Sequence, residues 1–462
     1  MISIKNKLKT HFIGIGGIGM SGIAELMHDL GYAIQGSDLI NNENTKRLRK
    51  KGVKIFIGHK ATNIKSAKAV VFSSAIKKTN PEILESKKNK IPLVSRADML
   101  AELMKTKKSI AIAGSHGKTT TTSLVGNILD EAKFDPTIVN GGIINSYSKN
   151  NRFGKGSWMV VEADESDGSF LKLPHELSII TNLDIEHLDF YKNKENLFKA
   201  FQLFILNLPF YGTSIICLDD KNLKNIAKNI TTRNIVTYSM KYKSADIFIE
   251  KIKYEKNLTF FKINLNKSIS NYKGTYNYSI KSIGNHNVLN GVASIVAAMI
   301  VGVKNNYIKK ALSNYIGVKR RFTYLGKLNA AYIYDDYAHH PTEILATLSA
   351  ANQISHNVVI AFQPHRYSRT NILMKDFVKV LSKIKKLYIL KTYSAGEKII
   401  KNATSKVLVK KLLKNKKEVK YIEKEESLND LLIQQTKVKS VIIFMGAGSI
   451  TKIAYKFIKN ND

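Results

Sequence analysis

Short apolar runs alternate with segments of helical periodicity along most of the chain, which is the pattern of parallel α/β folds. In the first quarter, each apolar run leads into a turn that is rich in glycine or serine. Strands are predicted at 10–15, 32–35 and 69–72, and helices at 19–30 and 96–104. We therefore expect a small domain with a parallel sheet at residues 1–106.

The middle of the chain repeats this alternation and adds a segment with a different period. Strands are predicted at 109–113, 158–161 and 177–181, with helices from about residue 118 and at 288–301. Between residues 241 and 282, apolar and polar positions alternate one by one. That period of two is typical of half-buried strands and predicts an antiparallel excursion within a central domain at 107–316.

The last third again shows apolar runs separated by helical segments. Strands are predicted at 331–334, 358–361, 386–390 and 441–444. A second Rossmann-like α/β domain of about this size is common, and we expect it at residues 317–462.

Composition agrees with a folded protein of several domains. A chain of 462 residues makes about three domains of roughly 150 residues each. Its 44% hydrophobic and 24% charged residues exclude wholesale disorder, and no apolar run approaches the roughly 18–20 residues of a membrane span. The single cysteine, Cys217, cannot form an internal disulfide, so a reducing cytoplasm is expected.

The net charge is unusual, because 73 basic residues stand against 36 acidic ones, a balance of +37. Such an excess often indicates binding to nucleic acid or to an anionic membrane. Here the lysines are spread along the whole chain without a basic arm or a nucleic-acid-binding motif, so we expect no specific nucleic-acid partner and no membrane insertion. The few arginines are more informative, and four of them form two pairs of near neighbours: Arg320, Arg321, Arg366 and Arg369.

A glycine-rich loop follows the first predicted strand and opens the first predicted helix. It contains Gly14, Gly16, Gly17 and Gly19 in the spacing G-x-G-x-x-G. Such a loop brings backbone N–H groups close to a pyrophosphate, and Asp38 lies where a carboxylate could meet a ribose hydroxyl. Taken alone, the loop suggests an NAD-dependent oxidoreductase, or glycines that only allow tight packing.

A second loop with the sequence GSHGKTT spans residues 114–120, again between a predicted strand and a predicted helix. Its amides would cradle phosphates, Lys118 would reach the β- and γ-phosphates, and Thr119 would hold Mg²⁺. The loop is shorter than the usual P-loop, whose first glycine would fall on Ile112. Two phosphate loops in one chain favour a transferase or a ligase over hydride transfer.

These elements together predict an α/β fold of three domains. The N-terminal domain has a Rossmann-like parallel sheet, the central domain is a P-loop ATPase domain with an antiparallel excursion, and the C-terminal domain is a Rossmann-like α/β domain.

Acidic side chains follow two of the central strands. Residues 162–167 hold four carboxylates, and concentrated negative charge at a strand end calls for a cation, for which Mg²⁺ bound to ATP is the natural choice. We favour Glu162 over Glu165 as the metal ligand because Glu162 ends the strand directly. His187 lies among acids in segment 181–189 and is a metal ligand, a proton carrier or a structural residue.

Further polar clusters lie at 284–290, 319–322, 335–343 and 363–369. The last two follow predicted strands, and ligands bind at the carboxyl edge of α/β sheets. Guanidinium groups suit carboxylates and phosphates, although each cluster alone could be a surface ion-pair network. Asn290 either contacts a nucleotide base or takes part in capping the helix that it opens.

The segments 14–25, 114–122, 161–170, 285–290, 335–343 and 363–370 closely resemble the Mur ligases of bacterial cell-wall synthesis, and the resemblance runs essentially from end to end. It implies that the three domains bind a UDP-sugar, ATP and an amino acid in that order, so the first glycine loop would hold uridine diphosphate and not NAD. The implied reaction joins L-alanine to UDP-N-acetylmuramate through an acyl phosphate in peptidoglycan precursor synthesis. ATP and Mg²⁺ are the implied cofactors, and a monomer or weak homodimer is expected.

The resemblance also implies the residues of each site. The UDP-sugar would be bound by Gly14, Gly16, Gly17, Gly19, Met20, Ser21, Asp38, Ser73, Ser74 and His116. ATP would be bound by Gly114, Ser115, His116, Gly117, Lys118, Thr119, Thr120, Asn290, Arg321 and Asp336. The amino acid would be bound by Tyr337, His339, His365, Arg366 and Arg369. The metal ligands would be Thr119, Glu162 and His187, and the catalytic residues Lys118, Glu162, His187, His339 and Arg366.

Other interpretations stay open from the sequence. A ligase of the same superfamily that adds a preformed peptide to UDP-N-acetylmuramate would share most of these segments. A nicotinamide-dependent dehydrogenase and a nucleic-acid-binding protein without enzymatic activity are the alternatives of other classes. The choice among L-alanine, glycine and L-serine is open, since one methylene is discriminated by only about 1–3 kcal/mol. No lysine can be assigned to the carbamoylated position of related ligases, so none is expected.

Overall fold

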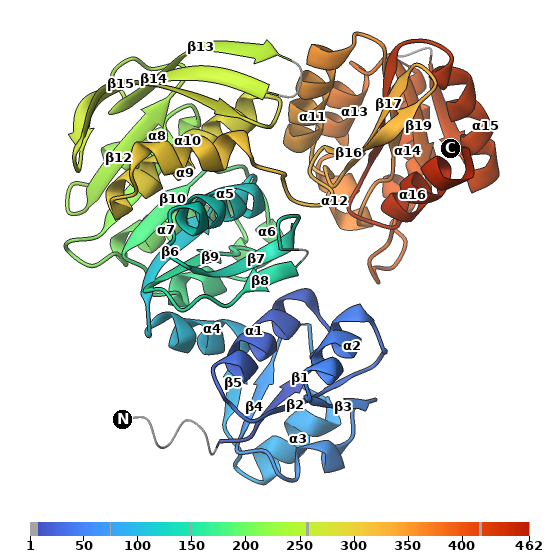
Figure 1. Ribbon diagram of the computed structural model, residues 1–462. Coiled ribbons are helices and arrows are strands. Elements are labelled where there is room, and N and C mark those ends of the chain that lie inside the picture. Colours follow the sequence, from blue (N-terminus) through green and yellow to red (C-terminus); the bar gives the residue numbers. More distant parts are fainter. Residues whose placement is uncertain (1–7, 74, 148, 256–257, 415–417, 462) are drawn as a thin grey trace. The chain divides into compact units, whose positions relative to one another are not determined.

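The computed structural model describes residues 8–73, 75–147, 149–255, 258–414 and 418–461 (Figure 1). The chain forms two compact units. Unit 1 comprises Met1–Ile252, Phe260–Ile280 and Leu289–Ile316, and unit 2 comprises Lys253–Thr259, Lys281–Val288 and Gly317–Asp462. Within the described residues, no helix is both long enough and apolar enough to span a membrane.

Unit 1 begins with a five-stranded parallel sheet in the order β3-β2-β1-β4-β5. Its strands are β1 (Thr10–Ile13), β2 (Ile34–Asp38), β3 (Lys54–Ile57), β4 (Ala69–Phe72) and β5 (Leu93–Ser95). Its helices are α1 (Ile18–Asp29), α2 (Glu43–Lys50), α3 (Pro81–Lys88) and α4 (Arg96–Met104). The order of strands reverses at β1, and such a switch point is where ligands bind in open parallel sheets.

Two predicted strands of this sheet differ from the structure at their ends. The strand predicted at 10–15 stops at Ile13, because Gly14 turns into the left-handed region with φ +74°. The strand predicted at 32–35 starts at Ile34 and continues to Asp38. Gly31, with φ +86°, ends the preceding helix and delays the start of that strand.

A buried carboxylate joins three segments of the N-terminal sheet. Glu82, on α3, is fully buried and accepts hydrogen bonds from Ser37 Oγ and Asn63 Nδ2, both at 2.6 Å. The ring nitrogens of His11 and His59 lie 3.4 and 3.3 Å from its Oε2. Burial alone would raise the pKa of Glu82, but His11, Ser37 and Asn63 lower it below its ordinary value of 4.5.

A ten-stranded sheet follows in the order β15-β14-β13-β12-β11-β10-β6-β9-β7-β8. Its first strands along the chain are β6 (Lys108–Ala113), β7 (Thr137–Ile144), β8 (Lys149–Arg152), β9 (Trp158–Glu162) and β10 (Leu177–Ile180). The others are β11 (Thr213–Cys217), β12 (Asn234–Ser239), β13 (Ile247–Glu255), β14 (Leu258–Ile269) and β15 (Tyr272–Ile280). Because β9 and β10 both pair with β6 in parallel, the segments that follow these three strands gather at one edge.

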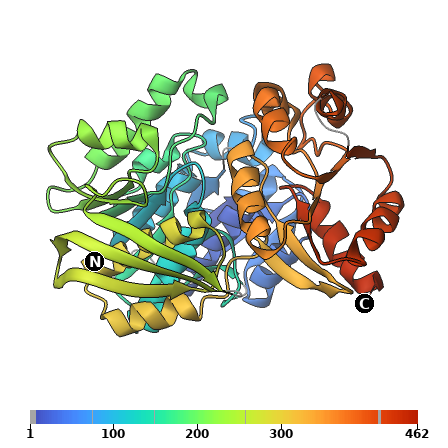
Figure 2. The ribbon, with the colours of Figure 1, turned by 90° about the horizontal axis from the view of Figure 1, so that it is seen from above.

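The antiparallel excursion predicted at 241–282 corresponds to β13, β14 and β15, the long strands at one end of the sheet (Figures 1 and 2). Two residues connect β14 to β15, and so short a connection between adjacent strands requires an antiparallel pair. The helices of this part are α5 (Lys118–Glu131), α6 (Leu188–Tyr191), α7 (Lys194–Leu206), α8 (Lys221–Lys228), α9 (Asn285–Val301) and α10 (Asn305–Ser313). The buried helix predicted at 288–301 therefore starts three residues earlier.

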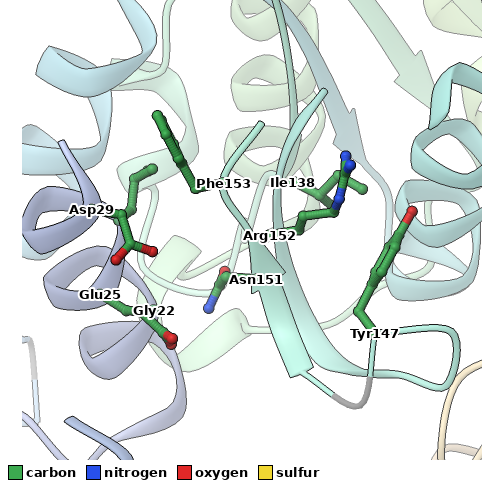
Figure 3. Close-up of a pocket in the computed structure, with 9 residues that line it drawn as sticks. Gly22, Glu25, Asp29, Ile138, Tyr147, Asn151, Arg152 and Phe153 are labelled. Atoms are coloured by element: carbon green, nitrogen blue, oxygen red, sulfur yellow. The ribbon is translucent and has the colours of Figure 1, made fainter. Parts of the chain in front are cut away.

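Helix α1 packs against β8, and a cavity of about 300 Å³ lies beside this contact (Figure 3). The packing is close, since a Cβ on Gly22 would lie 1.8 Å from the amide nitrogen of Asn151. The cavity is lined by Gly22, Glu25, Leu26, Asp29, Ile138, Tyr147, Asn151, Arg152 and Phe153. None of the residues that the sequence predicts for a site lines it.

Unit 2 contains a six-stranded sheet in the order β16-β17-β21-β18-β19-β20, in which only the β16–β17 pair is antiparallel. Its strands are β16 (Thr323–Leu328), β17 (Ala331–Asp336), β18 (Val358–Phe362), β19 (Lys386–Leu390), β20 (Val419–Ile422) and β21 (Ser440–Met445). Its helices are α11 (Pro341–Ile354), α12 (Tyr367–Ile372), α13 (Met374–Leu381), α14 (Ser405–Leu413), α15 (Glu425–Thr436) and α16 (Ile450–Asn461). The strand predicted at 331–334 runs two residues further, which buries Asp335 and Asp336 at its end.

The Glu82 network should stabilise the N-terminal sheet. We expect Glu82→Ala to reduce the opening free energy of β1 and β2 by about 3 kcal/mol, because several buried polar groups lose their partner. Since the pKa of Glu82 is lowered in the folded state, its contribution is complete above pH 4.5 and is lost as the pH falls below that value. Hydrogen–deuterium exchange of peptides from β1 and β2 measures both effects.

Glu82→Gln serves as the control, because an amide keeps the shape and part of the hydrogen bonding. It should lose less stability than Glu82→Ala. Equal exchange rates in wild type and Glu82→Ala at pH 7 would contradict the stabilising role of the network.

Candidate active site

The loop 114–120 joins β6 to α5, as the sequence predicts. Gly117 precedes the first residue of α5 and has φ +82°, and Gly114 has φ +131°. A Cβ on Gly114 would lie 2.2 Å from Thr181 Oγ1, and one on Gly117 would lie 2.7 Å from Asn290 Oδ1. Only glycine fits at both positions, and the loop presents its backbone at the N-terminus of a helix, where anions are stabilised.

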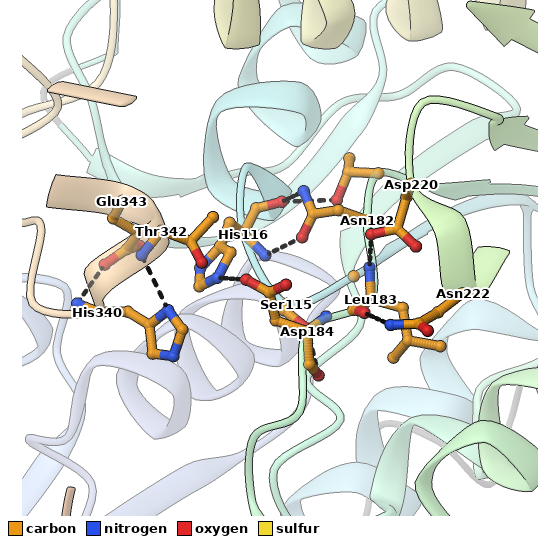
Figure 4. A network of polar contacts seen from close by, with 12 residues as sticks. Ser115, His116, Asn182, Leu183, Asp184, Asp220, Asn222, His340, Thr342 and Glu343 are labelled. Atoms are coloured by element: carbon orange, nitrogen blue, oxygen red, sulfur yellow. Dashed lines mark hydrogen bonds and ion pairs between the residues drawn. The ribbon is translucent and has the colours of Figure 1, made fainter. Parts of the chain in front are cut away.

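Residues after β10 fix this loop through hydrogen bonds (Figure 4). The His116 N–H donates to Asn182 Oδ1 at 2.8 Å, and the His116 carbonyl accepts from Thr181 Oγ1 at 2.6 Å. The Asp184 N–H donates to Ser115 Oγ at 2.8 Å, and Asp184 Oδ2 lies 2.8 Å from His116 Nε2. Ser115 and His116 therefore have structural partners within the loop's own neighbourhood.

Lys118 forms a buried ion pair with Glu165. Its Nζ lies 2.9 and 2.7 Å from the two carboxylate oxygens, and the side chain of Glu165 is 2% exposed. Burial alone would lower the pKa of Lys118, but Glu165, Asp164 and Glu162 raise it. Burial raises the pKa of Glu165 to about 7, even though the Lys118 ammonium opposes that shift.

Glu162, the last residue of β9, contacts Thr119 and not Lys118. Its Oε1 accepts from Thr119 Oγ1 at 3.1 Å, and its Oε2 accepts from the Gly141 N–H at 2.7 Å. A Cβ on Gly141 would lie 2.8 Å from both carboxylate oxygens. The predicted metal ligands Thr119 and Glu162 are thus neighbours, and Gly141 holds the carboxylate in place.

His187, a predicted metal ligand, lies beside Glu165. Its Nε2 is 3.7 Å from Glu165 Oε1, and donor atoms of Glu165, Glu186 and His187 all lie within 4.8 Å of one another. His187 has φ +56°, a left-handed conformation that a non-glycine residue seldom adopts. Two carboxylates and an imidazole form a donor set that fits a divalent cation.

In the N-terminal sheet, Asp38 closes the glycine loop. The Gly16 N–H donates to Asp38 Oδ2 at 2.7 Å, and a Cβ on Gly16 would lie 2.8 Å from the same oxygen. A Cβ on Gly19 would lie 3.2 Å from a guanidinium nitrogen of Arg96. The loop therefore lies between a strand and a helix, as the sequence predicts, and it approaches Arg96, which no sequence motif marked.

Two residues predicted for the UDP-sugar site, Met20 and Ser21, are buried at the start of α1. Both side chains lie in the packed face of α1, and Ser21 Oγ donates to the Ile18 carbonyl at 3.0 Å. The helical period turns these two positions toward the core. Ser73 directly follows β4 and is half-buried, while Ser74 lies outside the described residues.

In unit 2, the residues predicted for the amino-acid site gather around two histidines. The rings of His339 and Tyr337 are 5.2 Å apart, those of His339 and His365 are 5.9 Å apart, and Arg369 Nη1 lies 3.3 Å from His365 Nδ1. Burial, together with the neighbouring cationic groups, lowers the pKa of His365 to about 4. His365 is therefore neutral at pH 7.

Arg366 belongs to the same cluster, and its partner was not predicted. Its Nε lies 2.8 Å from Glu397 Oε1, and the ring of Tyr393 stacks on His365 with centroids 5.4 Å apart. Tyr393 and Glu397 lie in the loop after β19, where the sequence carries no recognisable motif. A glutamate following a small-residue turn, Ala395-Gly396, was the only available signal.

Two residues predicted to bind ATP from unit 2 have roles within that unit. The buried Asp336 carboxylate accepts from the Phe322 and Ala338 N–H groups at 2.6 and 2.8 Å, and burial raises its pKa to about 6. Arg321 lies over the ring of Tyr337, with its guanidinium carbon 5.2 Å from the centroid. Asp336 is the last residue of β17, and its carboxylate holds the backbone at Phe322 and Ala338.

Comparison with known proteins identifies the family. Models of the Mur ligase family match the chain over residues 9–108 (catalytic domain), 112–298 (middle domain) and 320–448 (glutamate ligase domain). The chain therefore belongs to the Mur ligase family and is an ATP-dependent ligase that forms amide bonds.

Individual relatives cover nearly the whole chain. UDP-N-acetylmuramate–L-alanine ligase of Rickettsia felis is 45% identical over 453 residues, 96% of this chain and 94% of the relative. The enzyme with the same name from Agrobacterium fabrum is 43% identical over 96% of this chain and 95% of its own length. The crystal structure of the UDP-N-acetylmuramate–alanine ligase from Thermotoga maritima superimposes with a TM-score of 0.81 at 29% identity, covering 98% of this chain and 99% of that one.

The close approach of Gly141 to Glu162 can be tested directly. We expect Gly141→Ala to raise the Mg²⁺ concentration for half-maximal ATP-dependent turnover about tenfold, because the added Cβ displaces the carboxylate next to Thr119. Titration of activity with Mg²⁺ at saturating ATP measures this shift. Gly326→Ala is the matched control, since its Cβ would make an ordinary contact of 3.5 Å. An unchanged Mg²⁺ dependence in Gly141→Ala would refute the positioning of Glu162 by Gly141.

Proposed function

We propose that this ligase joins L-alanine to UDP-N-acetylmuramate in peptidoglycan precursor synthesis. One observation supports ATP chemistry above all. The adjacent residues Lys118 and Thr119 contact two different carboxylates, those of Glu165 and Glu162, at the carboxyl edge of one sheet. The choice of substrates is supported by relatives that bear this name and cover more than nine tenths of the chain.

The reaction needs activation, because a carboxylate oxygen is a poor leaving group. Transfer of the γ-phosphoryl group of ATP to the lactyl carboxylate gives an acyl phosphate, and the amine of L-alanine then displaces phosphate from its carbonyl carbon. Lys118 would stabilise the charge of the transferring phosphoryl group, and the amides of loop 114–117 would bind the phosphates. Asn290, placed beside Gly117, would contact the nucleotide.

Mg²⁺ would be held by Thr119 and Glu162 at one position and by Glu165, Glu186 and His187 at another. When bound, it would neutralise phosphate charge at the reacting group. With Mg²⁺ and ATP present, Glu165 would share its negative charge between the cation and Lys118. Burial raises the pKa of Glu165 to about 7, and a bound cation would lower it again by favouring the ionised carboxylate.

Unit 2 would supply the amino-acid site. Arg366 and Arg369 carry the cationic groups that suit the carboxylate of L-alanine, and His365, which lies beside Arg369, is also next to His339. His365 is neutral at pH 7 because burial lowers its pKa to about 4, so it adds hydrogen bonding to the cluster but no charge.

The wider assignments follow from the same proposal. We assign the UDP-sugar to residues 1–106, ATP to 107–316 and the amino acid to 317–462. A ligase that consumes ATP and a nucleotide sugar is expected to act in the cytoplasm as a monomer or weak homodimer. The surplus of positive charge would favour anionic nucleotides at low ionic strength.

The first experiment measures phosphate release from ATP and Mg²⁺ with UDP-N-acetylmuramate, with and without L-alanine. We expect wild type to require both substrates, and Lys118→Ala to lose at least about 100-fold in rate, because the variant removes the cation that faces the phosphates. Lys385→Ala is a control that removes a lysine of unit 2, far along the chain from the phosphate loop.

Other outcomes would change the assignment. Phosphate release without L-alanine, or release that a preformed peptide supports and L-alanine does not, would point to a different acceptor. Glycine and L-serine in place of L-alanine measure how narrow the acceptor site is. If no combination of substrates gave phosphate release, the proposal would be refuted.

A further inference from the structure

Two loops at the carboxyl edge of the unit 2 sheet are joined like strands. The Arg366 N–H donates to the Tyr393 carbonyl at 2.8 Å, and the Tyr393 N–H donates to the Pro364 carbonyl at 2.8 Å. His365 and Tyr393 form an isolated parallel bridge, and their rings stack nearly flat with an angle of 10° between planes. The loop after β19 therefore braces the loop that carries His365 and Arg366.

Glu397 completes this brace with its side chain. Its Oε1 lies 2.8 Å from Arg366 Nε and accepts from Ser368 Oγ at 2.6 Å, while its Oε2 accepts from the Ser368 N–H at 3.0 Å. Both oxygens are thus engaged with the loop that precedes and begins α12. Burial alone would raise the pKa of Glu397, but Ser368 and Arg366 lower it, so the carboxylate is charged at pH 7.

Arg366 needs such support for two reasons. Its φ of +69° is a left-handed conformation that costs a non-glycine residue about 1–2 kcal/mol and persists only where the surroundings impose it. Its side chain is also 45% exposed and long, so without a partner it would sample many rotamers. Glu397 restrains the backbone next to Arg366 through its hydrogen bonds with Ser368, and it restrains the side chain of Arg366 through the contact with Nε.

The ion pair between Arg366 and Glu397 leaves part of the guanidinium group available for a second carboxylate. Glu397 engages Nε, the inner nitrogen of the guanidinium group, so the two terminal nitrogens can still form a bidentate contact with the carboxylate of a ligand. An arginine fixed in this way is preorganised, because the entropy of ordering its side chain is not lost on ligand binding.

We propose that Glu397 is a positioning residue for the incoming amino acid, and that it acts by holding Arg366 in the orientation that binds the α-carboxylate. This inference rests on the proposed function, which assigns Arg366 to the amino-acid site. It predicts an effect confined to the amino acid, with the two nucleotide substrates unaffected.

The test is a set of steady-state kinetics on Glu397→Gln. We expect the KM for L-alanine to rise at least about tenfold, with the KM values for ATP and UDP-N-acetylmuramate within twofold of wild type. Glu397→Asp, which keeps the charge, should restore part of the affinity. Glu423→Gln is the matched control, because Glu423 is an exposed glutamate of the same unit that pairs with Lys406 at 3.3 Å.

A double-mutant cycle separates positioning from a general structural role. If Glu397 acts through Arg366, Glu397→Gln should add less than twofold to the KM for L-alanine in the background of Arg366→Met. Ser368→Ala, which removes one of the anchoring hydrogen bonds, should give a smaller change in the same direction and stands in if Glu397→Gln does not fold.

The outcomes distinguish this inference from the proposed function. If wild type releases phosphate in response to L-alanine and Glu397→Gln has the same KM, the positioning role is wrong and the function stands. Equal losses for all three substrates, or additive effects in the cycle, would also overturn it. If wild type responds to no amino acid, the proposed function and this inference fail together.

Discussion

The ammonium group of Lys118 is largely shielded from solvent, and a shielded cation has to be neutralised by a nearby negative charge. Glu165 provides the negative charge with both of its oxygens, at 2.9 and 2.7 Å. This contact is possible because β6 and β9 are adjacent parallel strands, so the segments that follow them meet at one edge. The pairing of β6 with β9 therefore positions the phosphate loop and the acidic segment, and with them the contact between His187 and Glu165.

Close backbone approach is the second constraint on the same edge. Gly114 and Gly117 let the loop pass within contact of Thr181 and Asn290, and Gly141 lets an amide reach Glu162. These close approaches bring three different segments of the chain to the same edge of the sheet. A side chain at any of these glycines would push one of those segments away, so the geometry of the edge tolerates little variation.

In unit 2, several cationic side chains are held close to one another. Arg366 immediately precedes α12 and Arg369 lies within that helix, and burial keeps the nearby His365 neutral. Glu397 balances the charge of Arg366 and anchors the backbone next to it. The mutual repulsion of the arginines is thereby limited, and their side chains are kept in defined orientations.

Local patterns in the sequence determined much of the fold and the family. Apolar runs followed by glycine loops predicted strand, turn and helix correctly around 114–120, since those preferences act over a few residues. Ends of elements were less predictable: β17 extends to Asp336 because pairing with β21 continues to Met445, which no local pattern reveals. What only the tertiary structure decided is which carboxylate meets which partner. The sequence favoured Glu162 as a metal ligand, and its carboxylate meets Thr119. No local pattern showed that Lys118 and His187 lie beside Glu165, or that Arg366 lies beside Glu397. Such pairings depend on the order of strands in a sheet, and that order is set by long-range packing.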